Sequence, residues 1–222
     1  KLDLEVAAKR FDALYNAASN AGKLVLFDML LYGLDWYIGD VNVAAMLLGK
    51  PQLNPLEVIE EVAKRVKRFV SHFHGVEKAY VVAQLYPVLA VWQSSLGKLE
   101  KALKLAKEAL NALEELWNSC KNNKALTEEK LWPYIKLRQV KPDLWKELDR
   151  LSQHVYYYIA FVYRDADKLD KAVEYAEKAC KIAREFGYVY SEVGSCGLPL
   201  RLKTVKDGVP PVEEFERLWQ RI

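Results

Sequence analysis

Residues 97–110, GKLEKALKLAKEAL, and residues 167–180, DKLDKAVEYAEKAC, decide the fold, because the second stretch repeats the pattern of the first. Alanine recurs at the same places in both stretches: Ala102, Ala106 and Ala109 in the first, and Ala172, Ala176 and Ala179 in the second. This i, i+4, i+7 spacing places the alanines on one face of an α-helix, where small side chains let a neighbouring helix approach closely. The repeat therefore predicts two helices that each pack along an alanine-lined seam.

Each alanine-lined helix follows another amphipathic stretch, so we expect helical hairpins over residues 83–116 and 153–186. The matching residues of the second hairpin are Tyr156, Ile159, Ala160, Tyr163, Ala172, Ala176 and Ala179. In this pattern the hairpins resemble the tetratricopeptide repeat, which pairs two antiparallel helices with a period of about 34 residues. The hairpins start 70 residues apart (153 minus 83), so the resemblance implies one degenerate unit between them, over residues 117–152, where Pro133 and Pro142 disturb the pattern.

The composition predicts an all-α fold. The chain of 222 residues is 51% apolar and contains only 10 glycines and 8 prolines, which favours helices and a sizeable core. We expect one all-helical domain over residues 1–222, built as a stack of antiparallel helix pairs, either an α-solenoid or a compact helical-repeat domain. Its expected parts are N-terminal helices over 1–75, hairpins over 77–186, and an irregular tail with a short terminal helix over 187–222.

Turn-forming residues define the remaining helix boundaries. We expect a first helix over residues 3–19, and two short buried helices over residues 23–48 that are interrupted at Gly33. Thr127 is predicted to cap a helix that follows the first hairpin. Glycines and prolines are frequent over residues 187–212, so we expect this segment to be irregular.

The cysteines predict neither a disulfide framework nor a zinc site. The three cysteines are odd in number and far apart, with no C-x-x-C pair: Cys120, Cys180 and Cys196. A reducing cytoplasm is therefore the expected location. The abundance of Glu and Lys over Gln, Asn and Met is typical of a heat-adapted source.

The charge pattern narrows the class of partner. Net charge is only +3, so the whole molecule has no special attraction for nucleic acid or an anionic membrane. The most apolar segment is interrupted by Asp28, Asp35 and Asp40, which excludes a membrane span. These aspartates lack the spacing of metal ligands, so we expect helix caps or turn residues and predict no metal and no cofactor.

The expected function is non-catalytic binding of a peptide or partner protein. In tetratricopeptide repeats the first helix of each hairpin lines a concave face that contacts partners. The resemblance places these residues on that face: Gln84, Val91, Ser94, His154, Tyr157, Phe161 and Arg164. Tyr and Arg are favoured at interfaces because they bury a large area with little loss of entropy. The alternative is that the aromatic side chains pack against neighbouring helices or the tail.

Three further hypotheses remain open. Arg65 and His72 lie on one face of a predicted helix and are similar to the R-x4-6-H signature of HEPN ribonucleases, which implies acid/base chemistry by His72 and phosphate binding by Arg65. Basic clusters near Arg65 and Lys121 also permit RNA binding without cleavage. Finally, 6 Trp and 13 Tyr are many for a core of this size, so self-association of an aromatic patch is a third possibility.

Overall fold

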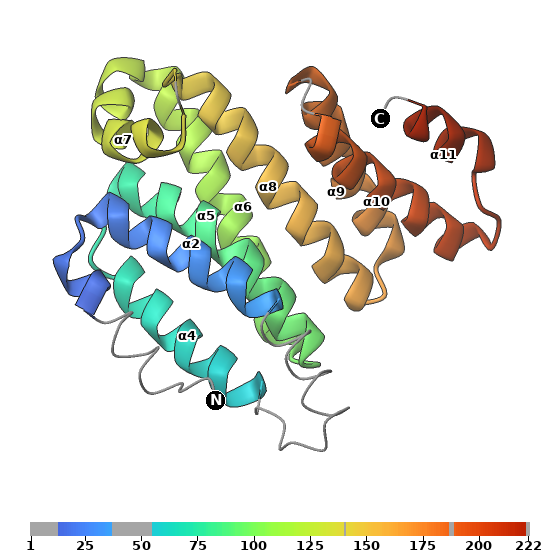
Figure 1. Ribbon diagram of the computed structural model, residues 1–222, viewed down its shortest axis with the longest axis horizontal. Coiled ribbons are helices and arrows are strands. Elements are labelled where there is room, and N and C mark those ends of the chain that lie inside the picture. Colours follow the sequence, from blue (N-terminus) through green and yellow to red (C-terminus); the bar gives the residue numbers. More distant parts are fainter. Residues whose placement is uncertain (1–12, 37–54, 140, 187–188, 221–222) are drawn as a thin grey trace.

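The computed structural model describes residues 13–36, 55–139, 141–186 and 189–220. Every regular element in these ranges is helical, and most of the helices lie side by side in one row that extends from α4 to α11 (Figure 1). The helices are α2 (Asn20–Trp36), α4 (Pro55–Val70), α5 (Gly75–Ser95), α6 (Leu99–Asn122), α7 (Lys124–Arg138), α8 (Leu144–Asp165), α9 (Leu169–Phe186), α10 (Val189–Asp207) and α11 (Val212–Trp219). The predicted all-α fold of packed antiparallel helix pairs is confirmed.

The alanine-lined seams form as predicted. Helix α5 pairs with α6, α8 pairs with α9, and α8 also packs against both α5 and α6. The alanines at the repeated positions all have 0% of their surface exposed: Ala102, Ala106, Ala109, Ala172, Ala176 and Ala179. Because the alanine side chains are small, the helices can approach closely at these positions, and larger buried side chains such as Leu105 and Leu113 fill the main core beside them.

The two hairpins also turn in the same way. Gly97 and Asp167 occupy equivalent positions, and both have a backbone φ in the left-handed region, +73° and +56°. In each turn the following N–H reaches back to the preceding helix: that of Lys98 donates to Gln93 O at 2.9 Å, and that of Lys168 donates to Tyr163 O at 2.9 Å. This is a Schellman arrangement, which satisfies carbonyl groups at a helix end. The structural repeat therefore includes the connecting turns.

The interval between the hairpins is built around α7. The described residues of 117–152 contain the end of α6, all of α7 and the start of α8, and α7 packs against both neighbours. Asn123 begins α7, because its side-chain oxygen accepts a hydrogen bond from the Leu126 N–H at 3.1 Å. The predicted cap, Thr127, is instead buried inside α7, and its hydroxyl donates to Asn123 O at 2.9 Å.

Two further segments differ from the prediction. Helix α2 passes through Gly33 without a break. Residues 37–48 of the predicted pair of short helices lie outside the described residues, as do residues 3–12 of the predicted first helix. The segment 187–212, predicted as irregular, contains α10 despite Pro199. Buried leucines of α10 explain this, since packing against α9 outweighs the hydrogen bond that the proline removes.

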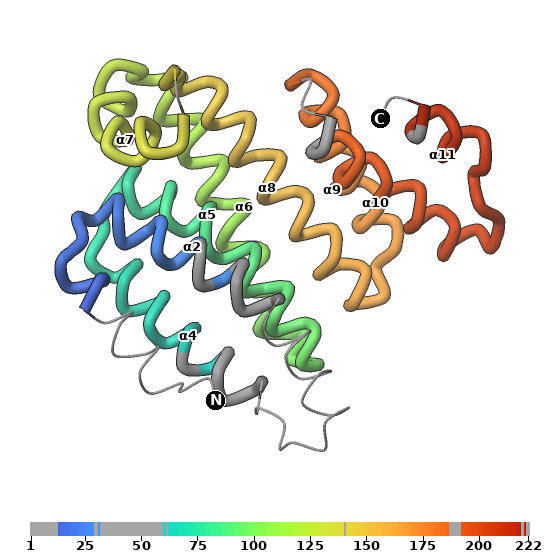
Figure 2. Tube along the Cα trace, in the orientation of Figure 1, coloured from blue at the N-terminus to red at the C-terminus, as the bar shows by residue number. Residues whose placement is uncertain are grey.

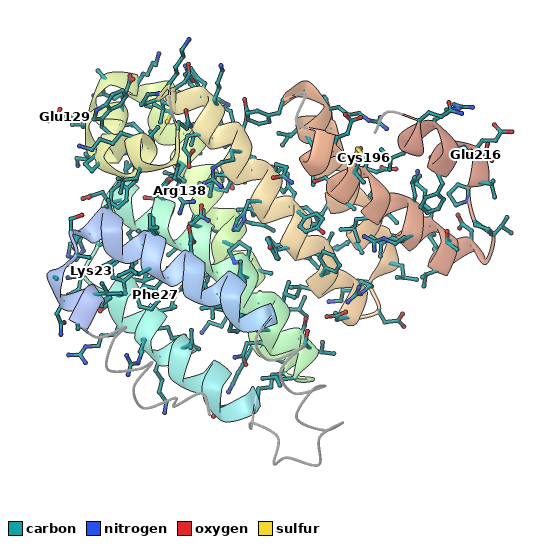
Figure 3. All side chains as sticks on the ribbon, viewed as in Figure 1. Lys23, Phe27, Glu129, Arg138, Cys196 and Glu216 are labelled. Atoms are coloured by element: carbon teal, nitrogen blue, oxygen red, sulfur yellow. A yellow bond between two sulfur atoms is a disulfide. The ribbon has the colours of Figure 1, made fainter. Side chains whose placement is uncertain are left out.

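The cysteine prediction is wrong in one respect. Cys180 of α9 and Cys196 of α10 form a disulfide with a Cα–Cα distance of 4.5 Å, visible beside the Cys196 label in Figure 3. The two residues meet because α10 returns alongside α9 (Figure 2). Disulfides are typical of oxidising compartments and also of intracellular proteins from hyperthermophiles, so the cytoplasmic location stays a prediction. Within the described residues, no helix combines the length and apolarity that a bilayer crossing requires.

The seam gives a direct test of the packing. We expect Ala106→Leu to lower the free energy of unfolding by about 1–3 kcal/mol, because the added side chain must push α6 away from its neighbours. Ala125→Leu, at an exposed position of α7, is the matched control and should change the free energy by less than about 0.5 kcal/mol. Urea denaturation of both variants measures the difference. Equal stability of the two would contradict a closely packed seam.

Candidate functional site

A buried carboxylate in the first turn of α8 is the centre of a polar network. Glu147 has 0% of its surface exposed and accepts hydrogen bonds from Tyr80 Oη at 2.5 Å and Gln139 Nε2 at 2.9 Å. The guanidinium of Arg150, one turn along α8, donates to the same carboxylate at 2.6 Å. Glu147 thus joins α5, the end of α7 and α8.

The network continues to α2 through an amide side chain. Arg150 Nη2 donates to Gln84 Oε1 at 2.7 Å, and Gln84 Nε2 donates to Asp28 Oδ1 at 3.2 Å. Asp28 also forms an ion pair with Arg138, which extends from α7 toward α2 (Figure 3). The expectation that Asp28 caps a helix or lies in a turn is therefore wrong, since it is a buried partner of an arginine within α2. No group of residues suited to hold a metal ion is found in the described ranges.

The network shifts the pKa values of its members in different directions. Burial acts to raise the pKa of Glu147, but the Arg150 guanidinium and the hydrogen bonds to the carboxylate outweigh burial and lower this pKa. At Asp28 burial prevails and raises the pKa, although Arg138 opposes it. Burial and the nearby Arg150 lower the pKa of His154 to about 3, so its imidazole is neutral at physiological pH.

The structure places part of the predicted partner-binding set inside the protein. His154 and Gln84 are buried, and His154 Nε2 donates to Gln84 O at 2.8 Å, across the contact of α5 with α8. Ser94 is also buried, and its hydroxyl donates to Asp165 Oδ2 at 2.5 Å, while Val91 is half-buried. The expectation that His154, Gln84 and Ser94 are exposed is wrong, because the packing of α8 on α5 buries them.

The remaining predicted residues form what we call the aromatic row, Tyr157, Phe161 and Arg164 of α8. The rings of Tyr157 and Phe161 meet edge to face with centroids 5.1 Å apart, and the Arg164 guanidinium lies 5.0 Å from the Phe161 ring centre. Both rings are half-buried, whereas 43% of the Arg164 side chain is exposed. The row therefore has one covered side and one free side.

Helix α10 forms the covered side of the aromatic row. Leu198 and Leu202 of α10 pack in one apolar cluster with Tyr157 and Phe161. Burial raises the pKa of the Tyr157 phenol, and the positive charge of Arg201 on α10 acts in the opposite sense. The segment predicted as an irregular tail thus supports the row and adds a second arginine beside it.

The residues of the ribonuclease hypothesis lie on and beyond α4. Arg65 is half-buried within α4, which ends at Val70, whereas His72 is exposed in the turn that follows. The His72 Nδ1 atom lies 3.3 Å from Phe69 O, which ties the ring to the end of the helix. His72 is therefore held outside the helix on which the spacing had placed it.

The fold and the aromatic row define an all-α protein of stacked antiparallel helix pairs. No family model, no curated protein and no solved structure matches the chain.

Proposed function

We propose that the chain is a non-catalytic module that binds a peptide or partner protein at the aromatic row, and that its hairpins are divergent tetratricopeptide-like repeats. The observation that carries the proposal is the stacking of Tyr157, Phe161 and Arg164 on a supported surface. Side chains that are already held in place lose little further entropy on binding, so more of the contact energy contributes to affinity.

The chemistry of the row points to a partner with both apolar and acidic groups. The ring edges offer apolar area, and Arg164 and the exposed Arg201 offer two guanidinium groups for carboxylates. Arg164 donates to the neighbouring Asp165 at 2.6 Å, which fixes the guanidinium over the ring. A partner carboxylate would thus meet a guanidinium that is already oriented.

The repeat interpretation is supported by features that the two hairpins share. Both have a buried alanine seam and the same Schellman turn, at Gly97 and at Asp167. Helix α8 packs against both members of the preceding pair, as the first helix of a stacked repeat does.

Partner capture tests the proposal. We expect Tyr157→Ala and Arg164→Ala each to weaken the binding of a captured and purified partner protein by about tenfold or more, as is typical of central interface residues. Tyr156→Ala is the matched control, because Tyr156 is the adjacent half-buried tyrosine but faces Tyr175 of α9, with ring centroids 5.8 Å apart. Titration of the purified partner gives the dissociation constants.

Three outcomes of these measurements are informative. Unchanged affinity in both variants would reject the aromatic row as the binding surface. A dimer in sedimentation that Tyr157→Ala dissociates would identify a second copy of the chain as the partner. RNA cleavage by the purified protein that is lost in Arg65→Ala and His72→Ala would reject the non-catalytic proposal in favour of a ribonuclease.

A further inference from the structure

A pocket of about 440 Å³ opens between α4, α5 and α6, away from the aromatic row. Its apolar wall consists of Ala63, Leu89 and Leu105, and its polar lining includes the inner residue Gln93. Pockets of roughly 300–1,000 Å³ are of the size that holds small-molecule ligands. We call this the lysine pocket, after the residues that surround its opening.

Four lysines give the pocket an excess of positive charge: Lys64, Lys67, Lys101 and Lys104. None of the four forms an ion pair with a described residue. Of the two glutamates that line the pocket, Glu60 pairs with Lys98, a lysine outside this set. An anion would therefore displace no direct ion pair of the four lysines. It would compete with the Glu60 carboxylate for two of them, because the pKa of Glu60 is lowered mainly by Lys98 and also by the charges of Lys101 and Lys64.

Gln93 supports a ligand site independently of the lysines. Only 5% of this residue is exposed, and its Oε1 atom is buried without a hydrogen-bond partner. Buried side-chain oxygens are rarely left without a donor, because the lost hydration is not compensated. A ligand hydroxyl or amino group that enters the lysine pocket would supply this donor once the amide turns toward it.

We propose that the lysine pocket binds a small phosphorylated molecule of the nucleotide class. The phosphates would meet the lysines at the opening, the ring system would lie against Ala63 and Leu105, and a base or sugar donor would reach Gln93. A continuous RNA backbone fits less well, since a pocket of about 440 Å³ has the size that holds one small ligand and not a run of phosphates. This proposal does not depend on the partner-binding function.

Calorimetry with three probes tests the site at fixed ionic strength: ATP, adenosine and inorganic triphosphate. We expect ATP to bind, and Lys104→Glu to weaken both ATP and triphosphate by about tenfold, because it reverses one charge at the opening. Lys181→Glu, at an exposed position of α9, should leave both affinities unchanged. Gln93→Leu should weaken ATP by about tenfold and leave triphosphate unchanged, because only ATP carries the ring and its donors.

The melting temperature of Gln93→Leu distinguishes a loss of ligand binding from a loss of folding. Gln93→Leu removes an unpartnered polar atom and preserves the side-chain volume, so its melting temperature should match or exceed that of the wild type. Lack of ATP binding at millimolar concentration, or equal affinity in Lys104→Glu, would overturn the proposal. Equal ATP affinity in Gln93→Leu would reduce the pocket to a nonspecific anion site. Binding of an RNA oligonucleotide that is tighter than ATP and lost in Lys104→Glu would overturn the small-ligand assignment.

Discussion

Glu147→Ala is expected to lower the free energy of unfolding by about 3 kcal/mol, the lower end of the usual cost of breaking a buried ion pair from one side, because 31% of the Arg150 side chain is exposed and can be hydrated. The substitution leaves the Arg150 guanidinium without its main counter-charge and the buried Tyr80 hydroxyl without its acceptor. Burial and the Glu147 charge together raise the pKa of Tyr80, so this phenol stays protonated and needs an acceptor. The buried Tyr80 hydroxyl then adds its own desolvation penalty, whereas Arg150 keeps its hydrogen bond to Gln84 Oε1.

An exposed pair provides the matched control for Glu147→Ala. Glu174 and Lys178 of α9 form an ion pair of the same 2.6 Å length as Glu147 and Arg150, but with 56% and 46% of their side chains exposed. Glu174→Ala should therefore cost less than about 1 kcal/mol, because water solvates and screens both charges. Urea denaturation at pH 7 measures both variants. A similar small loss in Glu147→Ala would show that the network contributes little to stability.

The hairpins could be predicted because their signal is local. The spacing of Ala102 and Ala106 along one helix already specifies which face is narrow, and Gly97 marks the turn. The tail could not be predicted in this way, since α10 forms through leucines whose packing partners lie on α9 and α8. The disulfide of Cys180 follows from the same packing and is invisible in the cysteine spacing.

The polar network could be predicted even less, because its members come from four helices. A weak signal does exist at Glu147, which lies between Leu144 and Leu148 on the apolar side of α8. A carboxylate at such a position needs a partner, but the sequence does not indicate that the partners include Tyr80. Of the predicted binding residues, the aromatic row on one helix could be grouped from spacing alone, whereas the burial of Gln84 depends on how α8 packs against α5.

The second large effect that we expect is a loss of stability in acid that depends on His154. The pKa of His154 in the folded state is about 3, below the value of about 6.5 in an unfolded chain. Between these values the unfolded chain binds a proton that the folded protein does not. The contribution of His154 to stability is therefore complete above about pH 6.5 and falls as the pH decreases toward 3, by on the order of 5 kcal/mol over the whole window.

His154→Gln should abolish this part of the pH dependence. The glutamine amide can still donate to Gln84 O but does not titrate, so the variant should lose less stability than the wild type between pH 7.5 and 4.5. Urea denaturation at several pH values in this range gives the two slopes. Glu147 and Asp28 are present in both proteins, so their own titration cancels in the comparison.

His74→Gln is the matched control, because His74 is exposed just before α5 and its substitution should leave the slope as in the wild type. Equal slopes in the wild type and His154→Gln would mean that the imidazole can be protonated without unfolding. The contact of α8 with α5 would then tolerate a buried positive charge beside Arg150. A steeper slope in the wild type and in His74→Gln than in His154→Gln would instead establish that the contact of α8 with α5 requires a neutral histidine.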